Sequence, residues 1–144
     1  MNEQIIGLDI GDVRIGVAVS DRTRLIANPV DVITRVGWGP DCKKILEIMD
    51  RYDTRIAVSG LPLNMDGSEG FQARKVRELC AQLEKRGVTV YYQDERLTTV
   101  RAEDALLESG MSRQDRKGHV DKVAAAIILQ SYLDEERQKP QGAI

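Results

Sequence analysis

A carboxylate stands inside the first apolar run of the chain, Ile5–Gly11 (IIGLDIG). A short apolar run of this length is typical of a strand that is buried on both faces, at the centre of a sheet. The charge of Asp9 is costly in such a place unless it is paired or bound to a cation. Residues 13–20 then alternate as a second strand would, after a short turn at Gly11–Asp12. The sequence therefore predicts an N-terminal hairpin with an acid on its central strand.

Three further strands and four helices follow in the apolar pattern. A strand is expected over residues 25–33, and Pro29 places it at a sheet edge because proline cannot donate to a strand ladder. Strands over residues 55–60 and 88–92 each follow a helix, so they should run parallel to the first strand. The predicted helices are one capped by Asp41, one over residues 71–86, one from Thr98 or Thr99 to Glu108, and one over residues 119–137. This order predicts an α/β fold with a five-stranded mixed sheet and helices on both faces.

The length and composition fit one globular domain. The chain has 144 residues, 42% of them hydrophobic and 31% charged, and we place the domain at residues 1–138 with a flexible tail at 139–144. No apolar run approaches the roughly 18 residues that span a membrane, and no basic signal peptide opens the chain, so a cytoplasmic location is expected. The net charge of −2 gives no global signal for nucleic acid, so any such surface must be a local patch or use metal. Cys42 and Cys80 lack CxxC spacing and are expected to be reduced thiols in or beside helices.

Two more acids are expected close to Asp9. Asp121 precedes Ala124 and Ile128 by one and two turns, on an inward stripe of a helix that is apolar nearly all round. Glu95 follows the strand over residues 88–92, where its side chain can reach the C-terminal edge of the sheet. Three convergent carboxylates repel one another, and their oxygen ligands favour Mg²⁺ or Mn²⁺. Two such ions suit phosphodiester hydrolysis, in which one activates water and the other stabilises the leaving oxygen.

Spacing alone leaves structural roles open for these acids. Asp9 could instead pair with Arg14 or Arg96, and Glu95 could be a solvated loop acid. The only histidine, His119, could shuttle protons or bind phosphate, but a lone histidine at a helix start is more often a cap or a surface residue. Asp9 and Asp121 are each predicted on a buried element, and this favours a metal site over these alternatives.

Other segments admit both a structural and a functional interpretation. Residues 61–70 form a turn-rich loop beyond a strand end, which is either a connector or a substrate-contacting loop. Trp38 is expected to anchor the loop before a helix rather than to bind a ligand. The basic side chains that could surround the acids and hold phosphates are Arg14, Arg96, Arg113, Arg116 and Lys117. The last three of these are equally typical of a solvated face.

Five segments of the chain, in order, resemble the bacterial YqgF (RuvX) family. They are residues 7–11 (GLDIG), 14–21 (RIGVAVSD), 60–67 (GLPLNMDG), 94–99 (DERLTT) and 121–125 (DKVAA). The resemblance covers residues 5–133 and implies the ribonuclease H-like fold, with strand order 3-2-1-4-5 and strand 2 antiparallel. Members of the family are described as Holliday junction resolvase candidates and as nucleases that mature the 5′ end of 16S ribosomal RNA precursor.

The resemblance also implies roles for individual residues. The catalytic, metal-binding acids that it implies are Asp9, Glu95 and Asp121. The substrate contacts or supporting groups that it suggests are Arg14, Asn64, Arg96, Thr98 and Lys117. The chain departs from the family in one place, because Val13 stands where a lysine often precedes the arginine of the first motif. This departure would remove one phosphate contact and leave the acids untouched.

Together these features predict a metal-dependent endonuclease that matures pre-16S ribosomal RNA or, alternatively, resolves Holliday junctions. Asp9 would bridge two Mg²⁺ or Mn²⁺ ions, with Glu95 and Asp121 each completing one site. One rival is an ATPase of the actin and sugar-kinase type, which pairs two copies of this fold, whereas 144 residues hold one. Another is a non-enzymatic assembly or junction-binding factor. The chain is expected to be a monomer or a homodimer, since a resolvase needs two facing sites and RNA trimming does not.

Overall fold

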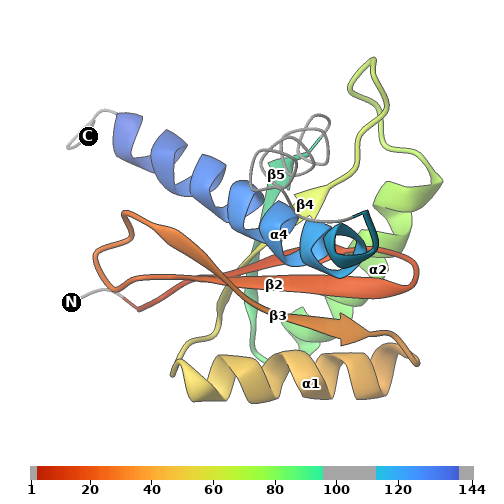
Figure 1. Cartoon of the computed structure of the whole chain (residues 1–144), viewed down its shortest axis with the longest axis horizontal. Coiled ribbons are helices and arrows are strands. Elements are labelled where there is room, and N and C mark those ends of the chain that lie inside the picture. Colours follow the sequence, from red (N-terminus) through yellow and green to blue (C-terminus); the bar gives the residue numbers. More distant parts are fainter. Residues whose placement is uncertain (1–2, 96–112, 140–144) are drawn as a thin grey trace.

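The computed structural model describes residues 3–95 and 113–139 of the chain, with side chains for residues 3–95 and 121–139. These residues form five strands and three helices (Figure 1). In chain order they are β1 (Ile6–Ile10), β2 (Arg14–Ser20), β3 (Ala27–Thr34), α1 (Trp38–Arg51), β4 (Ile56–Leu61), α2 (Phe71–Lys85), β5 (Thr89–Asp94) and α4 (Arg113–Gln138). The helix predicted to end at Glu108 lies outside the described residues.

The strands form one mixed sheet in the order β3-β2-β1-β4-β5. β1 pairs antiparallel with β2 and parallel with β4, and β4 pairs parallel with β5. The predicted strand order and the antiparallel direction of strand 2 are therefore confirmed. Pro29 lies on β3, an edge strand, where its missing N–H costs least.

The described helices lie on both faces of the sheet. On one face, α1 and α2 pack their apolar stripes against Ile6, Leu8 and Ile10 of β1. On the other face, α4 crosses the sheet and packs against a second cluster that includes Ile5 (Figure 1). Because side chains alternate along a strand, Asp9 points to the same face as Ile5, toward α4. Among the described helices none has the length and apolarity to cross a membrane.

Two helices begin earlier than the sequence predicts. α1 starts at Trp38, after Gly37, and Asp41 lies inside its first turn instead of capping it. The buried Asp41 carboxylate accepts hydrogen bonds from the Val36 N–H (3.0 Å) and from Arg35 Nε (3.1 Å), so it fixes the chain that enters the helix. α4 starts at Arg113 rather than near His119. By contrast α2 ends one residue before the predicted limit, and Gly87 follows it with φ +90°, as expected of a glycine just beyond a helix.

Candidate active site

The structure brings the three predicted acids together at one end of the sheet. Asp9 lies near the C-terminal end of β1, Glu95 directly follows β5, and Asp121 belongs to α4. The side chains of Asp9 and Glu95 hydrogen-bond to one another, and Asp121 is close enough to act on Asp9 electrostatically. Asp9 precedes the other two acids by more than 80 residues of sequence. The three acids meet because β1 is central in the sheet and α4 crosses it.

Burial and mutual repulsion keep a proton on the pair formed by Asp9 and Glu95. Desolvation, and then the nearby charge of Asp121, raise the pKa of Asp9 from 3.8 to about 6. Desolvation, and then the charge of Asp9, raise the pKa of Glu95 from 4.5 to about 8. Near neutral pH the pair therefore holds one proton. The shared proton takes the place of a counter-cation.

Asp121 is neutralised in a different way, by an arginine of β2. Arg14 Nε donates to Asp121 Oδ2 at 2.5 Å, and the two side chains are 37% and 21% exposed. The alternative in which Arg14 pairs with Asp9 is not what the structure shows. Arg14 lies beside one of the three acids, and its predicted role as a substrate contact stays a prediction. At neutral pH the three acids and Arg14 together carry two negative charges, one positive charge and one shared proton.

Two glycines make the convergence possible, and the sequence did not single them out. A Cβ on Gly16 would lie 1.9 Å from the backbone oxygen of Asp121, so the absence of a side chain lets α4 approach β2. A Cβ on Gly60 would lie 2.2 Å from Glu95 Oε2, so the Glu95 carboxylate crosses the strand where β4 is bare. A glycine inside a strand often marks such a close approach. The presence of Gly16 and Gly60 within predicted strands was therefore the signal in the sequence that could have indicated these contacts.

The three carboxylates are chemically suited to a divalent cation, but they are not arranged around one ion position. Three carboxylates offer oxygen ligands only, the type that Mg²⁺ and Mn²⁺ prefer. Arg14 offsets only one of the three carboxylates, and the proton held by Asp9 and Glu95 shows that the site has fewer positive charges than carboxylates. Across residues 3–95 and 121–139, no three Asp, Glu, His or Cys side chains are already arranged to hold a metal. An ion would have to draw Asp121 from Arg14 and displace the proton on Glu95.

The other predicted substrate contacts are placed unevenly. Asn64 closes a turn in the loop after β4, where its Nδ2 donates to Ser68 Oγ at 3.0 Å and its backbone N–H to the Ser68 carbonyl at 2.9 Å. These hydrogen bonds give Asn64 a structural role in the turn, and its role as a substrate contact stays a prediction. Lys117 and His119 lie on the first part of α4, whose side chains are not among those described. Arg96 and Thr98 lie outside the described residues.

The raised pKa values predict that the protein loses stability as the pH rises. Between about pH 4.5 and 8 the folded carboxyls of Asp9 and Glu95 hold a proton that the unfolded chain has released, so protonation favours the folded state. In the presence of a chelator, the free energy of unfolding should fall by on the order of 2–4 kcal/mol between pH 5.5 and pH 8. Urea unfolding at a series of pH values measures this. The double variant Asp9→Asn/Glu95→Gln should flatten the profile, and an unchanged slope in that variant would contradict the assignment.

Solved structures with the same arrangement of elements define the class of fold. The chain superposes on T. thermophilus RuvC in complex with Holliday junction substrate with a TM-score of 0.61, at 15% identity, over 96% of this chain and 98% of that chain. It superposes on the fowlpox virus resolvase complexed with Holliday junction DNA with a TM-score of 0.57, at 13% identity, over 92% and 98%. The fold is thus that of the ribonuclease H-like resolvases, as predicted.

Sequence comparison narrows this class to one family. The model of the family described as "RuvX: Holliday junction resolvase" matches residues 3–135, and the chain belongs to this family. A relative from Clostridioides difficile (strain 630), named "Putative pre-16S rRNA nuclease", is 47% identical over 135 residues, which cover 93% of this chain and 96% of the relative. A relative of the same name from Trichormus variabilis is 41% identical over 140 residues, covering 96% and 93%.

Proposed function

We propose that the protein is a metal-dependent endonuclease that hydrolyses phosphodiester bonds in the 5′-end maturation of pre-16S ribosomal RNA. The observation that carries this proposal is the convergence of Asp9, Glu95 and Asp121 at one end of the sheet. Relatives of similar length that carry the name of pre-16S rRNA nuclease support the choice of substrate. The proposed place of action is the cytoplasm, with the protein as a monomer or a homodimer.

In this proposal the residues that would hold Mg²⁺ or Mn²⁺ are Asp9, Glu95 and Asp121. Bound ions would offset the charge of the substrate phosphate and lower the pKa of a water molecule. Glu95 would have to give up the shared proton to act as a ligand, so binding of an ion would be favoured as the pH rises toward 8. Arg14, which lies beside Asp121, would be placed to contact a phosphate oxygen of the substrate. Gly16 and Gly60 keep the acids at the required positions.

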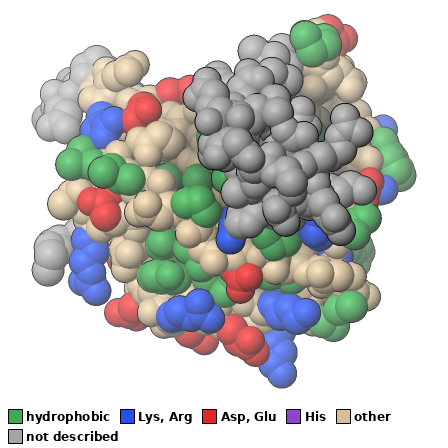
Figure 2. Space-filling view, in the orientation of Figure 1, with side chains coloured by type: hydrophobic (Ala, Val, Ile, Leu, Met, Phe, Trp, Pro, Cys, Tyr) green, Lys and Arg blue, Asp and Glu red, His purple; other side chains and the backbone are tan. Residues whose placement is uncertain are grey.

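Metal is a more plausible source of affinity for phosphate than the surface charge is. Figure 2 shows Lys and Arg side chains mixed with Asp and Glu along the edge of the molecule formed by α1. The chain carries 21 basic and 23 acidic residues, so this mixture reflects the composition as a whole. Attraction of the substrate therefore has to be local, at the metal site and at individual contacts.

Holliday junction resolution is the second candidate function. It is supported by the description of the matching family and by the likeness of the fold to junction-bound RuvC. Cutting two strands of a junction requires two active sites that face each other, so this function predicts a homodimer. Maturation of one RNA end has no such requirement.

One assay separates these functions. The full chain is incubated with Mg²⁺ or Mn²⁺ and either a 16S 5′-leader RNA or a four-way DNA junction, with a chelator control and with Asp9→Asn in parallel. We expect cleavage of the RNA that requires the ion and Asp9. Cleavage of the junction alone would replace the proposal with the resolvase function. Tight binding without cleavage of either substrate would instead indicate a non-catalytic assembly factor.

A further inference from the structure

The only tryptophan and the only phenylalanine of the chain are both on the surface, at the starts of adjacent helices. Trp38 opens α1 and is 50% exposed, and Phe71 opens α2 and is 68% exposed. Trp38 therefore lies on a helix rather than in the preceding loop, and its predicted role as an anchor stays a prediction. An exposed aromatic ring that also lines a cavity is a candidate binding residue, and of these two rings Trp38 lines one.

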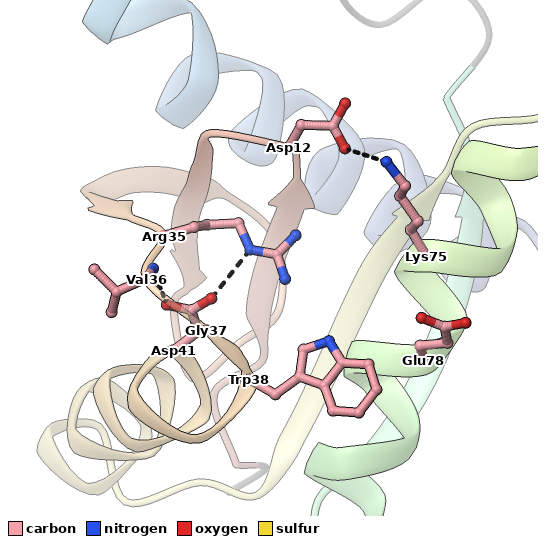
Figure 3. A pocket seen from close by; sticks show the side chains of 8 residues that line it. All are labelled: Asp12, Arg35, Val36, Gly37, Trp38, Asp41, Lys75 and Glu78. Atoms are coloured by element: carbon pink, nitrogen blue, oxygen red, sulfur yellow. Dashed lines mark hydrogen bonds and ion pairs between the residues drawn. The ribbon is translucent and has the colours of Figure 1, made fainter.

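Trp38 lines a cavity of about 690 Å³, which lies between the turn joining β1 to β2, the start of α1, and α2 (Figure 3). A volume of this order is typical of sites for small ligands and single nucleotides. The Asp12–Lys75 ion pair, with Nζ and Oδ1 3.3 Å apart, bounds one side, and Arg35 with the buried Asp41 bounds another. Trp38, at the start of α1, lies away from the Asp12–Lys75 pair, and Glu78 projects from α2 one turn beyond Lys75.

The charges around the cavity decide which chemical group suits it. Both cations are already paired, Lys75 with Asp12 and Arg35 with Asp41. Glu78 also lines the cavity, and among the described residues it has neither an ion-pair nor a hydrogen-bond partner. Three carboxylates against two cations disfavour a phosphate. A flat, uncharged ring that carries N–H donors fits instead, because it can stack on the indole and donate to the free carboxylate.

We propose that this cavity binds one unpaired base of a single-stranded RNA, stacked on Trp38 and hydrogen-bonded to Glu78. Guanine suits it best, since its N1–H and N2–H donors lie side by side and match the two oxygens of a carboxylate. Only an unstacked base can enter such a cavity, which favours single-stranded RNA over a duplex. The identity of the RNA rests on the proposed function. The cavity would add a base-specific contact to the phosphate contacts proposed at the three acids.

The position of the cavity relative to the acids supports the same occupant. Asp12, at its edge, follows Asp9 by three residues, and three residues of extended chain span at most about 11 Å. The β1–β2 turn separates the acids on the α4 face from the cavity on the face of α1 and α2. A strand whose phosphate lies at the acids can therefore pass over this turn and place a base, within a few nucleotides, on Trp38.

The fluorescence of the only tryptophan tests the proposal directly. The full chain is titrated in a chelator with 12-nucleotide RNAs, one that contains guanosines and one made of uridines, and binding is measured in parallel from the anisotropy of labelled RNA. We expect quenching that saturates with the dissociation constant from anisotropy, and tighter binding of the guanosine-containing RNA. Trp38→Ala should weaken binding of that RNA about 5- to 150-fold, whereas Trp38→Phe, which keeps a stacking ring, should stay within a few-fold of wild type.

Two further variants complete the design. Glu78→Gln should reduce the preference for guanosine. The matched control is Tyr91→Ala, which removes an aromatic ring of similar exposure (46%) on β5, at the edge of a separate cavity, and should leave binding unchanged. Binding without quenching, or equal binding by Trp38→Ala and wild type, would overturn the proposal. Quenching by an arginine-rich peptide and not by RNA would also overturn it, in favour of a basic protein segment.

The outcomes separate this inference from the proposed function. Cleavage that depends on Asp9, with no response of Trp38 to RNA, would leave the nuclease in place and refute the base-binding cavity. Guanosine-dependent quenching, with no cleavage under any ion, would establish the cavity and refute the nuclease.

Discussion

Asp9→Asn should reduce the rate of phosphodiester cleavage by at least about 10³-fold, the scale seen when a catalytic group is removed. Asp9 is the acid that both other carboxylates act on, through the hydrogen bond from Glu95 and the charge of Asp121. An amide of the same shape offers one neutral oxygen and cannot balance a cation. The measurement is single-turnover cleavage of the 16S 5′-leader RNA at saturating protein, so that a loss of binding does not count as a loss of rate.

The same variant should be at least as stable as the wild type, which separates a catalytic role from a structural one. At pH 7 the ionised Asp9 carboxylate is held at a cost, because its pKa is raised to about 6. Replacing it with a neutral amide should increase the free energy of unfolding by about 1 to 3 kcal/mol in a chelator. Urea unfolding measures this value. A destabilised Asp9→Asn protein, or one that cleaves at the wild-type rate, would contradict the assignment.

Gly16→Ala should destabilise the protein by about 3 kcal/mol or more, near the upper end of the effects of overpacking. The added Cβ would lie 1.9 Å from the backbone oxygen of Asp121 and 2.3 Å from its carbonyl carbon. Those atoms belong to the backbone of α4, so no side chain can rotate away and the helix itself has to move. We expect the displacement of Asp121 to lower cleavage as well. Urea unfolding and the cleavage assay on the same preparation measure both effects.

Gly39→Ala is the matched control for this substitution. Gly39 lies in the first turn of α1, and a Cβ there would have no atom within 4 Å. Alanine is favoured over glycine in a helix, so this variant should match or exceed the stability of the wild type by up to about 1 kcal/mol. If Gly16→Ala unfolded at the same urea concentration as Gly39→Ala, the close contact between β2 and α4 would be refuted.

The sheet was predictable because its signals are local. An apolar run around Asp9 indicates a central strand, Pro29 indicates an edge, and two helix-to-strand connections indicate parallel pairing. The acids were predictable for a related reason, since a charge on a buried element needs a compensating group. The resemblance to a family named the same three acids independently.

What escaped prediction depends on contacts between distant segments or on competing local preferences. The pair of Arg14 and Asp121 joins residues 107 positions apart, and spacing does not specify it. The start of α4 was misplaced because a polar run that includes Gly118 disfavours a helix by about 1 kcal/mol at the glycine. Asp41 has the residue type of a cap, but Gly37 occupies the position before the helix, and Asp41 fixes the segment that enters the helix instead.

The order in which the elements are synthesised bears on when the proposed nuclease can act. Its first acid lies on β1, whereas the last lies on α4, which is synthesised more than 100 residues later. Until α4 has emerged and packed across β1 and β2, the growing chain holds Asp9 without Asp121 and without the apolar residues that α4 adds to the second core cluster. If the three acids act as proposed, a nascent chain without α4 would not cut the RNA around it.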